Sequence, residues 1–183
     1  MKNVLLCVTG SIAVYKAAEI ANRLTKDGYH VEVIMTDSAQ RFVTPLTFQT
    51  LTKNKVHTDM FADYEPSQVE HISLAKKADL CLVAPATANV IGKIAGGIAD
   101  DMVTTVIMAL EHAPAFICPA MNTNMYENTI VQKNIKYLTE LGYRFVEPKN
   151  SHLACGDTGK GALADVDLIV STAEAYLEGL SEK

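Results

Sequence analysis

The chain has 183 residues, of which 49% are hydrophobic and 20% charged, and its formal net charge is −5. This length and composition are typical of one globular domain spanning residues 1–183, with no room for a second large catalytic domain. The mild acidity argues against a nucleic-acid-binding protein, which normally has a basic face, and no apolar run reaches the roughly 18–20 residues of a membrane span.

The four cysteines are far apart in the sequence, and none belongs to a CxxC pair. This spacing favours free thiols in a reducing compartment over disulfide bonds or a zinc site, so we expect a cytoplasmic protein without a metal ion. Cys7, Cys81 and Cys118 lie inside apolar runs and are expected in the core, whereas Cys155 lies in a polar stretch.

Apolar segments of strand length alternate with longer segments of helical periodicity. The apolar runs predict strands covered on both faces, at residues 3–8, 31–35, 79–84 and 115–118. The helical pattern predicts helices at residues 13–26, 101–111, 126–141 and 171–180, the first ended by Gly28 and the last capped by Ser171 or Thr172. This alternation predicts an α/β fold with a three-layer, doubly wound parallel sheet, which binds ligands at the carboxyl ends of its strands.

The first strand is followed by Thr9, Gly10, Ser11, Ile12 and Ala13. Gly10 allows a tight turn, and the amides at the start of the next helix, together with the Ser11 hydroxyl, can bind a phosphate. Taken alone, the segment favours the alternative of a plain glycine turn with a serine cap, since single-glycine turns are common. Neither GxGxxG nor GxxxxGK[ST] is present, so a dinucleotide or a nucleoside triphosphate is disfavoured and a mononucleotide remains possible.

Small polar residues follow the next two strands. Thr36, Asp37 and Ser38 can contact a ligand's sugar or phosphate, or they can cap the following helix. We expect the strand at 79–84 to end at Pro85, after which Thr87 and Asn89 offer hydrogen-bonding groups. The small residues beyond them allow close approach of a flat ligand or of another chain.

The fourth strand is followed by the segment PAMNTNMY at residues 119–126. The amide of Asn122 can bind a carboxylate or a carbonyl group, and Met121 and Met125 can cover an apolar ring. An Asn-capped helix start with core methionines is the alternative.

Glycines at positions 156, 159 and 161 predict a mobile loop around Cys155, with His152 and Lys160 nearby in the sequence. Reactive cysteines occupy such polar positions, although an incidental loop cysteine is about as plausible. His71 is expected in the first turn of a helix; a lone histidine is more often structural than catalytic.

Together these segments resemble the homo-oligomeric flavin-containing cysteine decarboxylases, from the first strand to about Ala162. The resemblance is carried by Gly10-Ser11-Ile12, by His71, by PATAN at 85–89, by PAMNTNMY and by ACGDTGKGA at 154–162. The family's PASANT is PATANV here, with Val90 in place of Thr, and its PxMNxxMW ends in Tyr126 in place of Trp.

The resemblance implies a flavodoxin-like fold that binds FMN at a contact between subunits, in homotrimers or multiples of trimers. Matching positions imply that the flavin is lined by Gly10, Ser11, Ile12, Thr36, Ser38, Thr87, Ala88, Asn89 and Ala120. They further imply that His71 is the acid/base residue of the oxidative half-reaction, Asn122 holds the substrate carboxylate and Cys155 is the proton donor of the reductive half. His152, Ala154 and Ala162 would lie along a flap over the substrate.

The implied reaction is decarboxylation of 4′-phospho-N-pantothenoylcysteine to 4′-phosphopantetheine and CO2 in coenzyme A biosynthesis, with the phosphopantothenate–cysteine ligase on a separate chain. Two alternatives are a lantibiotic-type peptidyl-cysteine decarboxylase, which stops at the enethiol, and a non-catalytic FMN-binding regulator. A flavin prenyltransferase is a more remote one, since it lacks the pairing of His71 with PAMN. The Cys155 segment favours the full reaction, because only that reaction needs the second proton donor.

Overall fold

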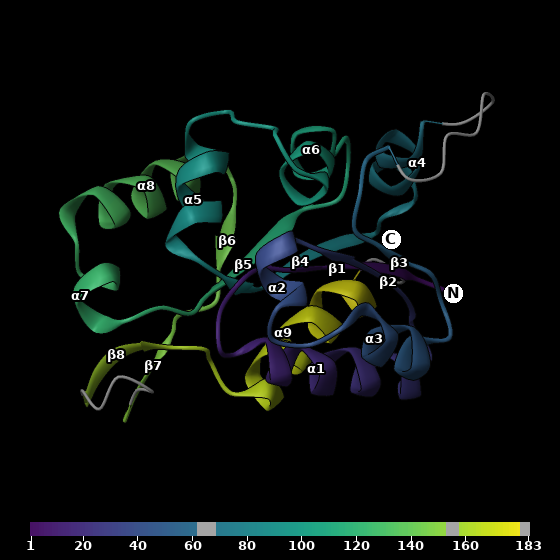
Figure 1. Ribbon diagram of the computed structural model, residues 1–183, viewed down its shortest axis with the longest axis horizontal. Helices are drawn as coiled ribbons and strands as arrows, with labels where there is room; N and C mark the ends of the chain where they lie inside the picture. The colour runs from purple at the N-terminus through teal and green to yellow at the C-terminus, as the bar shows by residue number, and fades with distance from the viewer. Residues whose placement is uncertain (62–68, 153–157, 180–183) are drawn as a thin grey trace.

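The central element is a six-stranded parallel sheet with the order β3-β2-β1-β4-β5-β6, in a computed structural model that describes residues 1–61, 69–152 and 158–179. The chain starts in the middle of the sheet, builds outward to β3, crosses back to β4 and then builds toward β6 (Figure 1). The predicted doubly wound, Rossmann-like α/β fold is thereby confirmed. The strands are β1 (Asn3–Val8), β2 (His30–Met35), β3 (Val56–His57), β4 (Leu80–Ala86), β5 (Ala115–Pro119) and β6 (Arg144–Phe145).

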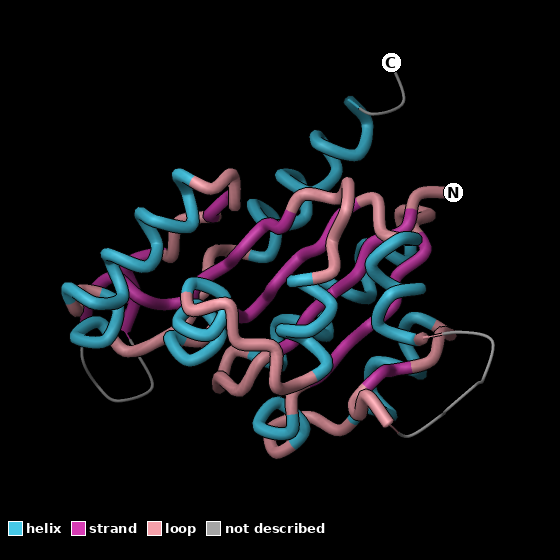
Figure 2. The backbone as a smooth tube through the Cα atoms, turned by 90° about the horizontal axis from the view of Figure 1, so that it is seen from above, coloured by secondary structure: helices cyan, strands magenta, loops and turns pink. Residues whose placement is uncertain are grey.

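Helices cover both faces of the sheet. One face is covered by α1 (Val14–Lys26), α3 (Pro45–Thr52) and α9 (Val166–Gly179). The other is covered by α4 (Glu70–Lys77), α5 (Ala88–Ala95), α6 (Met102–Met108) and α8 (Thr129–Glu140), and Figure 2 shows the strands side by side among these helices. None of the helices formed by the described residues is long and apolar enough to cross a membrane.

Strand residues alternate between the two cores. Val4, Leu6 and Val8 of β1 pack toward α1, whereas Leu5 and Cys7 pack toward α5 and α6. Because both faces are buried, every position of β4 and β5 is apolar, which explains the continuous runs in the sequence. Removing such a side chain, as in Leu6→Ala, costs about 2–5 kcal/mol in buried cores.

The three cysteines of the apolar runs are buried in β1, β4 and β5, as predicted. The sulfur atoms of Cys7 and Cys81 are 3.8 Å apart. Their contact, followed by burial, raises the pKa of Cys7, and burial raises the pKa of Cys118. The thiols of Cys7 and Cys118 are therefore protonated packing groups and not nucleophiles.

Several predicted boundaries were wrong. The last helix begins at Val166, and Ser171 and Thr172 lie inside it, with their hydroxyl groups donating to the Leu168 carbonyl. The segment predicted as one helix at 126–141 forms α7 (Thr123–Tyr126) and α8, capped by the side chains of Asn122 and Asn128. Strand β4 continues through Pro85 to Ala86, which pairs with Pro119 of β5.

A short antiparallel hairpin was missed entirely. It consists of β7 (Lys149–His152) and β8 (Thr158–Ala162), and it lies beside α7 (Figure 1). The prediction of a glycine-rich loop was therefore wrong for Gly159 and Gly161, which belong to β8. Gly161 has a φ of 149° and a Cβ atom there would lie 2.4 Å from the Met121 carbonyl oxygen, so this strand position requires glycine.

Candidate functional site

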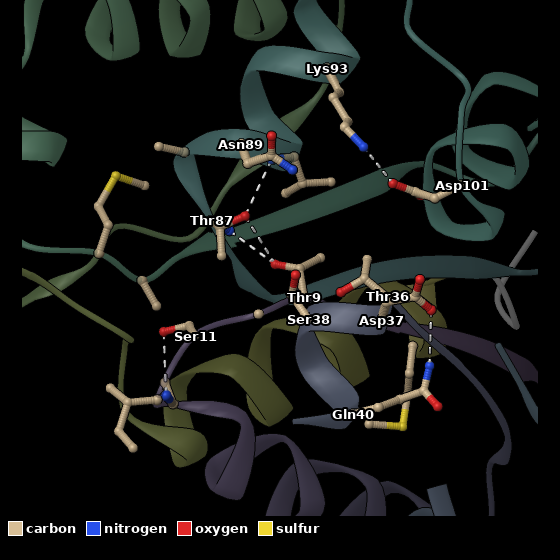
Figure 3. A pocket seen from close by; sticks show the side chains of 18 of the residues that line it. Thr9, Ser11, Thr36, Asp37, Ser38, Gln40, Thr87, Asn89, Lys93 and Asp101 are labelled. Atoms are coloured by element: carbon tan, nitrogen blue, oxygen red, sulfur yellow. Dashed lines mark hydrogen bonds and ion pairs between the residues drawn. The ribbon is translucent and has the colours of Figure 1, made fainter. Parts of the chain in front are cut away.

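A cavity of about 1280 Å³ opens at the carboxyl ends of the strands. The starts of α1, α2 (Asp37–Gln40) and α5 converge there, with Ser11, Thr36 and Ser38 on one side and Thr87 and Asn89 on the other (Figure 3). All the residues expected to contact the flavin line this cavity: Gly10, Ser11, Ile12, Thr36, Ser38, Thr87, Ala88, Asn89 and Ala120. Asn122 and Ala162 line it too, while the role of each residue remains a prediction.

The β1–α1 loop approaches α2 so closely that only glycine fits between them. A Cβ atom on Gly10 would lie 2.4 Å from the Cβ atom of Ser38. The Ser11 hydroxyl accepts a hydrogen bond from the Ala13 amide at 3.3 Å, and the first turn of α1 contains no acidic residue. The positive end of α1 therefore faces the cavity without a carboxylate of its own first turn, as an anion site requires.

The loops after β1 and β4 are joined by Thr9. Its hydroxyl donates to the Pro85 carbonyl at 2.7 Å and accepts from the Thr87 amide at 3.1 Å. Thr87 in turn caps α5 by accepting from the Val90 amide at 3.2 Å, and Thr36 caps α2 from the Ala39 amide at the same distance. At Thr36 the capping interpretation is thus confirmed, and the ligand interpretation stays open, because a hydroxyl that accepts can also donate.

The family departure at Val90 has a plain structural consequence. Its side chain is 2% exposed and packs among Ile91, Ile94 and Val103 in the core. An apolar side chain at this position therefore adds to the packing of α5 on the sheet.

An ion-pair cluster at the cavity wall was missed from the sequence. The Lys93 ammonium group lies 2.6 Å from Asp100 and 2.9 Å from Asp101, and all three residues line the cavity. Asp101 also caps α6 in a reciprocal capping box with Thr104. The spacing of Asp101 and Thr104 before an apolar run is a sequence signal for the start of α6, but it does not indicate the ion pairs with Lys93.

Replacing Asp101 with asparagine tests the charge of this cluster, because asparagine caps helices as well as aspartate does. Burial opposes ionisation of Asp101, but hydrogen bonds from Thr104 and Lys93 outweigh it and lower the pKa of the carboxyl group. A lowered pKa stabilises the fold above the unfolded-state value, near pH 4, and that contribution is lost as the pH falls through the folded value. We expect Asp101→Asn to lower the free energy of unfolding by about 1 kcal/mol at pH 7, after allowance for partial exposure.

Urea unfolding between pH 7 and pH 3 measures this difference, which should shrink toward the acidic end. Asp37→Asn, in α2 and away from Lys93, is the control. An equal loss of stability at all pH values would show that the side-chain amide disturbs the cap and that the charge contributes nothing.

The hairpin forms the far end of the cavity, next to Asn122. The Asn122 side-chain oxygen caps α7 by accepting from the Asn124 amide at 2.8 Å, and Met121 and Met125 flank it on the cavity wall. The Met121 amide donates to the Gly161 carbonyl at 2.9 Å, which holds β8 against this turn. The Asn-capped helix start and the cavity-lining methionines are therefore found together.

Ala154, which was expected in the flap, and Cys155, which was expected to be the proton donor, lie outside the described residues. His152 belongs to β7, where it is paired with Thr158 in the hairpin register, and Ala162 ends β8.

His71 lies in the first turn of α4, as predicted, but it is not among the residues that line the cavity. Helix α4 and helix α7, which follows Asn122, lie at opposite ends of the molecule (Figure 1). One copy of the chain therefore does not bring His71 and Asn122 together.

The start of α4 lies beside a partly buried cluster of ionisable side chains. The Nδ1 atom of His57 lies 2.9 Å from Glu70, the residue before His71, and the Lys55 ammonium group lies 2.6 Å from the same carboxylate. Glu32 of β2 lies 3.9 Å from the other ring nitrogen of His57. Val69 makes no side-chain cap, and the contacts of the Glu70 carboxylate tie the first turn of α4 to Lys55 and His57. Among the described residues, no group of three or more His, Cys, Asp or Glu side chains could hold a metal ion.

Comparisons with known proteins agree with this geometry. The family model described as flavoprotein matches residues 1–178. A probable phosphopantothenoylcysteine decarboxylase of Streptococcus mutans is 52% identical over 177 residues, which cover 96% of this chain and 99% of that protein. The coenzyme A biosynthesis bifunctional protein CoaBC of Bacillus subtilis is 54% identical over 175 residues, but this chain spans only 43% of its length.

Solved structures with the same fold include two of particular relevance. A PPC decarboxylase mutant with cysteine replaced by serine, complexed with pantothenoylaminoethenethiol, superposes with a TM-score of 0.87 at 33% identity, covering 97% of this chain and 98% of that one. The FMN-binding protein AtHal3 superposes with a TM-score of 0.84 at 34% identity, covering 97% of both chains.

Proposed function

We propose that this chain, which belongs to the flavoprotein family, is an FMN-dependent decarboxylase of coenzyme A biosynthesis that converts 4′-phospho-N-pantothenoylcysteine into 4′-phosphopantetheine and CO2. The observation that carries the proposal is the cavity at the carboxyl ends of the strands, which gathers the family's phosphate-type loop and its Asn-containing turn into one space. The chain covers nearly the whole length of a relative named for this activity. The scattered cysteines favour a cytoplasmic location.

The residues around the first loop fit FMN. Because Gly10 has no side chain, the loop can lie against Ser38 and its backbone amides can still approach a phosphate. The start of α1 supplies the favourable dipole. A cavity of about 1280 Å³ holds a cofactor together with a substrate, since single-ligand pockets measure roughly 300–1,000 Å³. When bound, FMN supplies the reversible two-electron chemistry that turns the thiol-bearing carbon into an electron sink for CO2 loss.

The chain's own residues supply binding and proton transfer. The Asn122 side chain, beside the hairpin, would hold the substrate carboxylate through its amide group. His71 would move the proton of the oxidative half-reaction, and Cys155 would donate a proton in the reductive half.

Helix α4, which carries His71, lies at the opposite end of the molecule from α7, which follows Asn122, so His71 would have to reach the site from a second copy of the chain. We therefore propose a homotrimer, or a multiple of trimers, in which each cavity is completed by the α4 helix of a neighbour. Ring-shaped head-to-tail contacts of this kind bring different surface patches together.

The direct test is to purify the protein, record the flavin absorbance and follow the conversion of 4′-phospho-N-pantothenoylcysteine by mass spectrometry. Loss of 44 Da as CO2 with formation of 4′-phosphopantetheine supports the proposal. An enethiol as the final product would favour a peptidyl-cysteine type of decarboxylase, and bound FMN without any CO2 release would favour a regulatory protein.

Replacing Gly10 with alanine tests the cofactor end of the cavity. The added Cβ atom forces the β1–α1 loop away from Ser38, so we expect the affinity for FMN to fall by about tenfold or more. Flavin fluorescence titration of the apoprotein measures it. Gly92→Ala in α5 is the matched control, because its Cβ atom would meet only Asn134 at 3.9 Å. Unchanged affinity in Gly10→Ala would place the phosphate elsewhere.

A further inference from the structure

We propose that Tyr126 is a positioning residue whose hydroxyl group holds the β7–β8 hairpin against the turn that carries Asn122, and thereby shapes the substrate end of the cavity. The inference rests on the proposed function for its substrate, and on the described contacts of α7 and the hairpin for its geometry. Tyr126 is also the position where this chain departs from the family's tryptophan.

Tyr126 is anchored on the Asn122 side by its backbone. Its amide donates to the Asn122 carbonyl at 2.9 Å, and its own carbonyl accepts from the Gln132 side-chain amide at 2.5 Å. Only 6% of the residue is exposed. The ring therefore has one position relative to the turn, and its hydroxyl group points to a defined place.

The hydroxyl group connects this turn to the hairpin through two charged residues. It donates to the Glu147 carboxylate at 3.3 Å, and the same carboxylate oxygen pairs with the Lys160 ammonium group of β8. The Lys160 nitrogen also lies 5.6 Å from the centre of the Tyr126 ring, within the range of a cation–π contact. Burial, followed by the charge of Glu147, raises the pKa of Tyr126, so the phenol keeps the proton that it donates.

Lys160 lies between the two glycines through which β8 touches α7. A Cβ atom on Gly159 would lie 2.6 Å from the Thr123 hydroxyl oxygen, and one on Gly161 would lie 2.4 Å from the Met121 carbonyl oxygen. Because these two glycines have no side chains, the backbone of β8 lies directly against the turn. The Lys160 side chain is the part of this stretch of β8 that reaches toward Tyr126 and Glu147.

The consequence reaches the cavity because the same strands line it. Ser151, Gly161 and Ala162 of the hairpin face the cavity together with Asn122. A hairpin that shifts along α7 changes the distance between these wall residues and the Asn122 amide. Substrate binding should therefore depend on the Tyr126 hydroxyl, whereas the flavin end, built from the β1, β2 and β4 loops, should not.

The test is the change Tyr126→Phe, which removes the hydroxyl group and keeps the ring. We expect KM for 4′-phospho-N-pantothenoylcysteine to rise about three- to tenfold, the effect of losing one hydrogen bond, with kcat and FMN affinity retained. Glu147→Gln should act in the same direction. The double variant should show no more than the larger single effect, because both changes break one connection. Tyr137→Phe, an exposed tyrosine on α8, is the matched control.

Hydrogen exchange of the β8 amides gives a readout that does not depend on activity. Faster exchange at residues 159–162 in Tyr126→Phe, but not in Tyr137→Phe, supports the positioning role. Unchanged exchange together with an unchanged KM would overturn it. A fall in FMN affinity as large as the rise in KM would also overturn it, because the effect would then not be confined to the substrate end of the cavity. If the wild-type protein releases no CO2, the proposed function fails, while exchange still decides whether Tyr126 holds the hairpin.

Discussion

Replacing His71 with asparagine should leave FMN bound and reduce turnover by about 10²–10⁴-fold, the usual contribution of a positioned acid/base group. Asparagine keeps a polar side chain of similar length but cannot exchange a proton near neutral pH. The cavity residues around the β1, β2 and β4 loops do not include His71, so the cofactor site should be intact. Flavin absorbance and steady-state CO2 release measure the two effects separately.

His112→Asn is the control, because that side chain is 90% exposed and should be dispensable. A mixture of His71→Asn with Cys155→Ser tests whether neighbours share a site. If each cavity takes His71 from a neighbour, reassembled mixtures should recover up to about a quarter of the wild-type rate of 4′-phosphopantetheine formation, because some sites then combine an intact His71 with an intact Cys155. If mixed oligomers form but show no recovered activity, the shared site is contradicted. Full turnover in His71→Asn alone would remove His71 from the mechanism.

Replacing Cys155 with serine should divert the product without preventing CO2 release. The reductive half-reaction needs a proton donor, and a serine hydroxyl is far less acidic than a thiol, whose pKa is near 8.5. We expect the enethiol to accumulate while the yield of 4′-phosphopantetheine falls by about 10²-fold or more. Mass spectrometry distinguishes the two products, which differ by two hydrogen atoms.

Cys118→Ala is the matched control for this change. Its thiol is buried in β5 with a raised pKa, so the alanine variant should be less stable yet form the normal product. A normal yield of 4′-phosphopantetheine from Cys155→Ser would mean that another group donates the proton.

The four central strands, β1, β2, β4 and β5, and their buried cysteines were predictable because burial on both faces leaves a continuous apolar run. Leu5, Cys7 and Cys81 are apolar for that local reason, whichever helix covers them. The loops after the strands were predictable in the same way, since a parallel sheet places the carboxyl ends of its strands at one edge. The residues lining the cavity around Gly10, Thr36 and Thr87 follow from that rule.

Helix ends and the hairpin were harder to predict, because weak local signals compete there with tertiary contacts. Ser171 looked like a cap, but Ile169 and Val170 are buried against the sheet and extend α9 back to Val166. Gly159 and Gly161 looked like loop residues. Instead, their lack of a side chain allows β8 to contact Met121 and Thr123. The sequence does not reveal this role, because it does not show that β8 and α7 pack together.

The sequence by itself therefore determined the layered sheet, the edge at which a ligand binds and the candidate residues on each loop, because burial and strand direction act locally. Only the tertiary structure decided which of those residues meet. It joined Lys93 to Asp100 and Asp101, and Tyr126 to the hairpin, across separations that periodicity does not encode. It also separated His71 from Asn122, since packing of α4 and α7 at opposite ends of the sheet is a property of the whole fold.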